Sequence, residues 1–463
     1  MMTSIAVGSP ASSTQIQELN KVARKHLIAT AVVIVTVLGY FIFSVFQFDV
    51  PGAIKKWNPD RASMFVLDTY AHKDHITMKW GDPENIVASF EGGYRYIYDT
   101  VPWLDRNYGN GGTSVKFDNG GEVVFFEDRV LMQNWPGEAI NYVFKVDTNG
   151  RPYVESLAGT PFKIPSWIRV TQNKVEVRPS LYERIQIYKS KVEVHRYDVG
   201  WKFFFFDFES PLRDYSIWQA LKLTFSEERV VPDKSNLSLV FDEFLNNEIW
   251  FHGVVLFSLV ETVLMALIGT MIASFIGLPL AFLAASNITP VSALRFALRR
   301  LFDCLRGIDT LIWSLILLRA FGPGLFTGMF AIALTDIGTL GKLMSEAIEN
   351  SESKQKEGIA STGASIMQQH RFGIIPQILP VFISQSLYYL ESNTRSAVII
   401  GAMGAGGIGL QFLGALQTGN DFENVAYMAT LVLITVILMD MMSARLRQLL
   451  IGNAPSTVKR KAR

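Results

Sequence analysis

Long apolar runs limit what this chain of 463 residues can fold into more than any other feature of its sequence. One run covers residues 27–48. Five more follow at about 254–284, 308–322, 325–343, 377–400 and 425–443. A helix of about 20 apolar residues crosses the hydrocarbon core of a bilayer. We therefore predict an α-helical membrane protein with six transmembrane helices, embedded in a lipid bilayer.

The first run predicts an uncleaved membrane anchor at 27–48, preceded by a cytoplasmic tail at 1–26. Lys21, Arg24 and Lys25 precede the run, as positive charges precede the apolar part of a signal peptide. However, the run is long enough to span a bilayer, and no A-x-A-like cleavage site follows it.

The lysines and arginines near the spans predict the orientation, because they are enriched in cytoplasmic loops. The short loops around 322–324 and 401–424 contain neither residue type. We therefore expect both termini, the basic tail 451–463 and the loop between the fourth and fifth spans to be cytoplasmic. The basic residues after the second, fourth and sixth spans are Arg295, Arg299, Arg300, Arg306, Lys342, Lys354, Lys356, Arg371, Arg445, Arg447, Lys459, Arg460, Lys461 and Arg463.

Residues 50–241 predict a large β-rich extracytoplasmic domain between the first and second spans. Alternating or aromatic-rich runs, typical of strands, occur at 94–98, 122–126, 142–146, 174–178 and 201–206. Asn149-Gly150 predicts a hairpin turn. Helical stretches at 216–225 and 236–250 lead back to the bilayer. The lone Cys304 excludes an intrachain disulfide, so this domain depends on its core.

No catalytic or metal-binding constellation is expected. Three histidines of the β-rich block have no metal-ligand spacing with cysteines or paired carboxylates, and three aspartates are scattered. A net charge of +1 does not favour nucleic acid. The chain has no G-x-x-x-x-G-K-[S/T] phosphate loop, so it cannot hydrolyse ATP itself and any such energy must come from a separate subunit. We predict a protein that is not an enzyme and binds no cofactor. The histidines are His72, His75 and His195, and the aspartates are Asp68, Asp74 and Asp82.

Two polar features lie within or beside the fifth span. Glu391 and Arg395 are one helical turn apart, and ionisable groups in a membrane usually face protein or water. They either pair with each other or contact a substrate, for which the Arg395 guanidinium would suit an oxyanion. The run GAGGIG at 404–409 matches a dinucleotide-binding pattern, but no βαβ unit surrounds it. These glycines either break the helix or allow close packing.

From about 240 to 450 the chain resembles the phosphonate-transport permease family PhnE, a branch of the type I ABC-importer membrane subunits. The resemblance rests on LPLAFLAASNITP at 278–290, LMSEAIE at 343–349, LESNTRSA at 390–397 and GAMGAGGIG at 401–409. It implies the type I importer permease fold over 242–450. The translocation path or gate would then include Glu391, Asn393, Arg395, Gly404, Gly406, Gly407 and Gly409.

The loop at 346–376, which begins with Glu346, is similar to the EAA loop of these importers. Glu357, Gly363 and Pro376 keep the spacing of that loop, while Gly358-Ile359, Gly373 and Ile375 depart from its residues. The resemblance implies a coupling helix that docks on a cytoplasmic ATPase, and the alternative is a solvated linker. An apolar face would be formed by Ala360, Ile366 and Met367.

The resemblance implies a permease subunit of an ATP-driven importer for phosphonates, phosphite or phosphate, in the bacterial inner membrane. We expect a homodimer with two copies of an ATPase subunit, which use ATP and Mg, and a periplasmic substrate-binding protein. Family members usually have only a short external segment between the first two spans, so nothing carries over to the block 50–241, which by analogy with another importer permease would dock the binding protein. The alternative is a membrane sensor whose external domain binds a ligand.

Overall fold

The computed structural model describes residues 13–57, 59–92, 96–109, 111–418 and 422–451. The chain divides into two units, 1–64 and 65–463. The first unit is helical, with α1 (Ser13–Gln47), α2 (Val50–Lys56) and the beginning of α3 (Pro59–Asp68). The part of α1 at Lys21–Gln47 is long and apolar enough to cross a membrane, as predicted for 27–48. Residues 1–12 and 452–463 of the two predicted tails lie outside the described residues, and α1 already begins within the tail predicted at 1–26.

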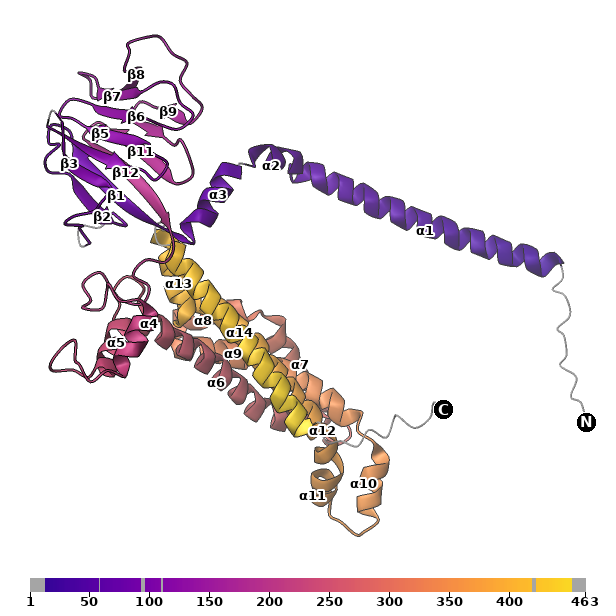
Figure 1. The fold of residues 1–463 in the computed structure, drawn as a ribbon. Helices are drawn as coiled ribbons and strands as arrows, with labels where there is room; N and C mark the ends of the chain where they lie inside the picture. The colour runs from indigo at the N-terminus through magenta and orange to yellow at the C-terminus, as the bar shows by residue number, and fades with distance from the viewer. Residues whose placement is uncertain (1–12, 58, 93–95, 110, 419–421, 452–463) are drawn as a thin grey trace, which may run out of the picture. The chain divides into compact units, whose positions relative to one another are not determined.

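The second unit begins with two six-stranded antiparallel sheets among its described residues (Figure 1). The first sheet has the order β2-β1-β12-β11-β10-β9, so it combines the first two strands of the domain with its last four. The second is a meander from β3 to β8. The strands are β1 (Ala71–Lys79), β2 (Val87–Phe90), β3 (Leu104–Tyr108), β4 (Gly112–Lys116), β5 (Glu122–Phe125), β6 (Val130–Gln133), β7 (Tyr142–Val146), β8 (Pro152–Ser156), β9 (Ile168–Val170), β10 (Lys174–Val177), β11 (Glu183–Tyr188) and β12 (Lys191–Val199).

One apolar core joins the two sheets into a β-sandwich. Ile76 and Val194 of the first sheet and Phe125, Met132 and Phe144 of the second belong to the same cluster of fully buried side chains. Inward-facing residues from two packed sheets form the core of a sandwich. The predicted β-rich domain is therefore present, with a core of its own.

Three of the five predicted strand runs are strands, namely β5, β7 and β10. The predicted turn joins β7 to β8, where Gly150 has a positive φ of 79°. Residues 94 and 95 of the run 94–98 lie outside the described residues, and its Ile97 forms only an isolated bridge with Ser89.

The strand predicted at 201–206 is wrong, because these aromatic residues form turns that pack onto the helices. Trp201 and Phe204 contact the rings of Trp250 and Tyr427. The two helices predicted next are α4 (Ile217–Thr224) and α5 (Asn236–Leu245). The second ends before the predicted residue 250, where the Asn247 side chain accepts the N–H groups of Ile249 and Trp250.

The remaining helices, apart from α10 and α11, run alongside one another in Figure 1, and α6 packs against α9 and α12. Small residues let these helices approach closely. A Cβ added to Gly269 of α6 would lie 2.8 Å from Cγ2 of Ile332 on α9. The elements are α6 (His252–Ala284), α7 (Ser292–Gly307), α8 (Thr310–Phe321), α9 (Leu325–Glu349), α10 (Ser353–Ala360), α11 (Ile366–Gln369), the π-helix η1 (His370–Ile374), α12 (Ile375–Ile400), the π-helix η2 (Gly401–Ala405), α13 (Ile408–Thr418) and α14 (Phe422–Ile451).

Each of the six predicted spans coincides with a helix, but their number stays a prediction. Four helices among the described residues are long and apolar enough to cross a membrane: Lys21–Gln47, His252–Ala284, Ile366–Ala405 and Phe422–Leu450. The other two predicted spans, at 308–322 and 325–343, coincide with α8, which is apolar but shorter, and with α9. Helix α7 was not predicted.

Candidate functional site

The predicted coupling loop folds as a helical hairpin between α9 and α12. Helix α10 leads to a turn at Gly363, whose φ of +82° favours glycine. Helix α11 then begins with a capping box, in which Gln368 Oε1 accepts the Ser365 N–H at 2.8 Å. Pro376 lies at the start of α12 within the continuous helical run Ile366–Ala405, directly after the π-helix η1, so its missing N–H leaves the preceding turn one donor short.

Two contacts hold this hairpin, which we call the coupling segment (352–376), onto the start of α12. The Gln377 side-chain oxygen accepts the Glu352 N–H at 2.9 Å, and its amide nitrogen donates to the Glu352 carbonyl at 3.3 Å. Gly373 is buried, and a Cβ there would lie 3.1 Å from Lys356 Cα. The departure from the family pattern at Gly373 therefore coincides with a close approach of α10 to η1.

The tip of the coupling segment exposes apolar side chains. Ile366 is 70% and Met367 76% exposed, and Ala360 and Glu357 are also exposed. Figure 1 shows α10 and α11 projecting from one end of the neighbouring helices. Exposed apolar side chains on a short helix provide the kind of face that a groove in a partner can bind.

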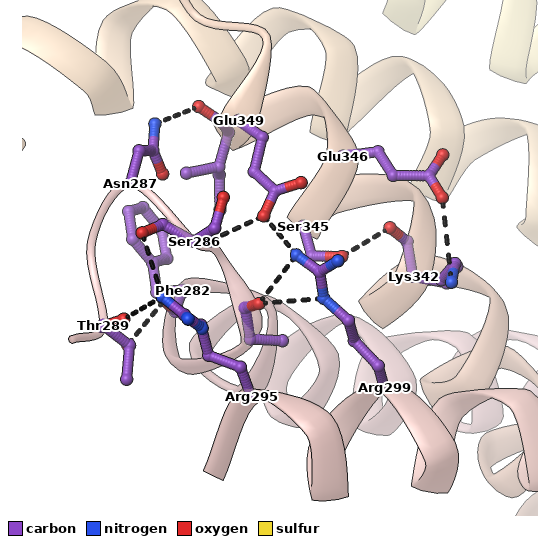
Figure 2. A network of polar contacts seen from close by, with 12 residues as sticks. Phe282, Ser286, Asn287, Thr289, Arg295, Arg299, Lys342, Ser345, Glu346 and Glu349 are labelled. Atoms are coloured by element: carbon purple, nitrogen blue, oxygen red, sulfur yellow. Dashed lines mark hydrogen bonds and ion pairs between the residues drawn. The ribbon is translucent and has the colours of Figure 1, made fainter. Parts of the chain in front are cut away.

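A polar network joins the ends of α6 and α9 to the middle of α7, just before the coupling segment begins (Figure 2). The Arg299 guanidinium of α7 pairs with the Glu349 carboxylate and donates to the Ala284 carbonyl at 3.3 Å. Glu349 also accepts the Ser286 N–H at 2.6 Å. Asn287 donates to the Ile348 carbonyl at 2.8 Å, so the residues after α6 are tied to the end of α9.

From the sequence, Arg299 is only a signal of orientation, and this network was not predicted. Arg295 lies one turn before Arg299 and donates to the Thr289 carbonyl at 2.9 Å. The i, i+4 spacing of the two arginines, which puts them on one face of a helix, was the available signal. Glu346, which was predicted as part of the coupling loop, lies at the edge of this network, and the Glu346 carboxylate is 3.9 Å from Lys342 Nζ.

In the middle of the helices, Glu391 and Arg395 form an ion pair, with 3.3 Å between Glu391 Oε1 and Arg395 Nη2. The mutual pairing considered from the sequence is therefore present. The Arg395 side chain is nevertheless 52% exposed, against 14% for Glu391. A contact between Arg395 and a substrate stays a prediction.

Asn393 lies on the buried side of the same helix and joins three helices. Its amide donates to Thr270 Oγ1 of α6 at 2.8 Å and to Asp336 Oδ2 of α9 at 2.5 Å. Because a buried carboxylate needs hydrogen-bond donors, this contact explains how Asp336 is accommodated among apolar side chains. Asn393 therefore has a packing role in addition to its predicted place in the translocation path.

The glycine run at 404–409 both breaks the helix and allows close packing, the two interpretations that the sequence left open. Gly404, Gly406 and Gly407 have positive φ values of 112°, 88° and 69°, and separate α12 with η2 from α13. A Cβ on Gly407 would lie 2.4 Å from Thr262 Oγ1, and one on Gly409 1.9 Å from the Val398 carbonyl oxygen. The Thr262 hydroxyl also accepts the Ile408 N–H at 2.9 Å, which anchors the break to α6.

Comparison with known proteins identifies this helical part of the chain. Residues 277–449 match the model of the binding-protein-dependent transport system inner membrane component family. The phosphite transport system permease protein PtxC of Stutzerimonas stutzeri is 34% identical over 190 residues, which cover 41% of this chain and 69% of that protein. This chain belongs to that permease family.

Two further comparisons cover similar parts of the permease. The phosphate-import permease protein PhnE of Mycolicibacterium smegmatis is 34% identical over 197 residues, or 42% of this chain, but the match spans only 37% of that protein. A structure of the MetNI methionine ABC transporter in inward-facing conformations aligns with a TM-score of 0.39 at 19% identity, covering 42% of this chain and 95% of that chain.

The matched region contains every predicted site residue of the permease, from Glu346 to Gly409. The β-sandwich lies outside it. Membership of this family makes the chain a transport subunit and not an enzyme, and it does not favour the alternative prediction of a membrane sensor.

Proposed function

We propose that the chain is the membrane permease subunit of an ATP-driven importer for phosphonates or related phosphorus oxyanions. The coupling segment is the single observation that supports this function most. It is a hairpin with exposed apolar side chains, and it follows directly on the end of α9, which the Arg299–Glu349 network ties to α6 and α7. A partner that moves this segment would move the ends of those helices together.

The proposed partners are two copies of an ATPase subunit, which hydrolyse ATP with Mg, and a periplasmic substrate-binding protein. The permease would act as a homodimer in the bacterial inner membrane. An apolar groove of about 940 Å³ lies between α6 and α12 and is lined by residues such as Phe275, Leu278 and Phe382. We propose that the second copy of the permease packs against this groove. The basic residues beside α7 and the coupling segment support a cytoplasmic side for this end and an external side for the sandwich.

The proposed substrate class rests on the names of the relatives and on Arg395. The relatives are described as permeases for phosphate and phosphite. The half-exposed Arg395 guanidinium is suited to phosphate-like oxygens. Binding of phosphonate, phosphite and phosphate to the cognate binding protein, followed by uptake of each anion, would identify the transported one.

Co-purification tests the proposal at its supporting observation. A tagged chain should bring down an ATPase subunit, and Met367→Glu should reduce the amount recovered, because a charge at the exposed tip disfavours apolar docking. Phe225→Glu is the matched control, since Phe225 is 90% exposed and lies outside the coupling segment. Failure of the unchanged chain to recover any ATPase would contradict the importer function.

A further inference from the structure

The inner face of the first sheet carries three polar side chains at the end where β12 leaves the sandwich. His72 and Asp74 are two residues apart on β1, and therefore point to the same face. His72 is paired directly with Asp198 of β12 in the antiparallel register. His72 is 7% and Asp74 1% exposed. One possible ligand atom from each of the three residues lies within 4.8 Å of the others.

Each of these side chains has one polar atom held by a neighbour. His72 Nδ1 lies 3.1 Å from the Gly200 carbonyl oxygen, Asp74 Oδ1 accepts the Tyr98 hydroxyl at 2.7 Å, and Asp198 Oδ1 lies 3.5 Å from Arg196 Nη2. The other atoms of the set are less well satisfied. Among the described residues, His72 Nε2 and Asp74 Oδ2 are buried without a hydrogen-bond partner.

The Gly200 carbonyl determines the tautomer of His72. A carbonyl only accepts hydrogen bonds, so Nδ1 carries the proton and a neutral ring presents a lone pair at Nε2. Nε2 lies 4.0 Å from Asp198 Oδ2. Electron-pair donors from an imidazole and two carboxylates therefore converge, an arrangement that calls for a cation between them.

The nearest cationic side chains do not occupy this position. Lys202 Nζ is 3.9 Å from Asp74 Oδ2, beyond hydrogen-bonding distance, and donates instead to the Tyr98 hydroxyl at 2.9 Å. Arg196 is shared between Asp198 and the exposed Asp118, whose Oδ1 lies 2.7 Å from Arg196 Nη2.

We propose that His72, Asp74 and Asp198 bind a divalent transition-metal ion of the Zn²⁺ type. One imidazole nitrogen and two carboxylate oxygens, with water completing the coordination, suit such an ion. The contacts to Gly200, Tyr98 and Arg196 orient the ligands in the way that outer-shell partners of metal sites do. His72 and Lys202 also line a cavity of about 260 Å³, which provides a path for entry.

The bound ion would stabilise the junction between the sandwich and the helices. Gly200, whose carbonyl holds His72, is followed directly by Trp201, and Trp201 packs against Trp250 and Tyr427. The site therefore lies where β12 passes into the segment that contacts α6 and α14. This inference concerns the sandwich and does not depend on the proposed transport function.

Titration of the full-length chain with Zn²⁺ tests the site. The chain is purified in detergent, stripped with a chelator, and bound metal is measured by elemental analysis and calorimetry. We expect one Zn²⁺ per chain, not displaced by excess Ca²⁺. His72→Ala and Asp74→Asn should each weaken binding more than about 100-fold, since loss of a ligand exceeds loss of an outer-shell partner.

Matched controls separate the site from general surface binding. Asp128→Asn removes an exposed carboxylate of the same domain, and His26→Ala removes an exposed histidine of α1, and both should bind as the unchanged chain does. Unfolding temperatures without metal check the fold. If a buried variant is unfolded, Asp198→Asn replaces it, because the Asp198 side chain is 32% exposed.

Two results would overturn the proposal. One is no Zn²⁺ binding by the unchanged chain, or unchanged binding by every folded variant among the three ligand substitutions. The other is binding that appears only after Lys202→Met, which would mean that the ammonium group supplies the positive charge in the native site.

Discussion

Individual backbone positions decide how closely the end of α12 can pack, and the glycines after residue 400 show this at atomic distances. Gly409 faces the backbone of the preceding helix, with Val398 O and Ala402 N as the nearest atoms to an added Cβ. Gly414, five positions later on α13, has no atom within 4 Å of an added Cβ. The two positions therefore differ in what a methyl group would meet, although both are helical glycines.

Gly409→Ala should destabilise the permease by at least about 1–3 kcal/mol, because the clash is with backbone atoms that cannot rotate away. Thermal unfolding in detergent and the yield of folded protein measure the effect. Gly414→Ala is the control and should be neutral or slightly stabilising, since alanine has the higher helix propensity. Equal behaviour of the two variants would contradict the close packing at Gly409.

We expect the buried carboxyl group of Glu91 to make the stability of the folded chain depend on pH. Burial, followed by the nearby Glu423 carboxylate, raises the pKa of Glu91 well above its usual value, although Glu91 Oε1 accepts the Lys73 N–H at 2.6 Å. The folded chain then keeps a proton that the unfolded chain releases above about pH 4.3. Its contribution to stability is complete below that pH and is lost as the pH rises through the folded-state pKa.

The unfolding temperature of the unchanged chain should therefore fall more steeply between pH 5 and pH 8 than that of Glu91→Gln, which cannot ionise. Glu84→Gln is the matched control, because Glu84 is exposed on the same domain. Parallel pH profiles for the unchanged chain and Glu91→Gln would show that Glu91 does not titrate in this range.

At the scale of elements, the coupling segment is attached to the bundle by polar contacts at its base and is exposed at its tip. Arg299 and Glu349 form an ion pair between α7 and the end of α9, and the Gln377 side chain of α12 accepts the Glu352 N–H. Gly363 is the turning point between α10 and α11. No atom lies within 4 Å of a Cβ added there, so a substitution acts through backbone conformation and not through a clash.

Gly363→Val should reduce uptake at least about tenfold, because a β-branched residue at positive φ costs about 1–2 kcal/mol and would redirect the hairpin. Substrate capture by the binding protein should be unchanged, since the segment transmits energy input and does not contact substrate. Gly358→Ala, a helical position with open space around it, is the control. Failure of capture as well as uptake would assign a different role to this segment.

At the scale of the molecule, the sandwich is an insertion with closely spaced ends. The Gly200 N–H donates to the Tyr70 carbonyl at 2.8 Å, and Ala71 and Gly200 form a backbone bridge. The core shared by the two sheets comes from residues between these ends. The helical bundle and the sandwich therefore have separate cores, and the segment after Gly200 belongs with the helices.

Replacing residues 71–199 by a short Gly/Ser linker should leave a folded chain that still recovers the ATPase. Uptake and affinity for the binding protein should both fall if the sandwich docks that protein, as we propose. Tyr70 and Gly200 are kept, so the aromatic contacts of Trp201 and Phe204 remain. Unchanged uptake together with unchanged binding-protein affinity would exclude the docking role.

The sequence by itself determined the features that depend on local pattern. Apolar runs located the long helices, alternating or aromatic-rich runs located β5, β7 and β10, and Asn149-Gly150 marked a turn, because residue spacing and allowed φ values act over a few positions. Only the tertiary structure decided which distant residues meet. Arg299 with Glu349, Asn393 with Asp336, and His72 with Asp198 come together through helix packing and strand register, which no local pattern encodes.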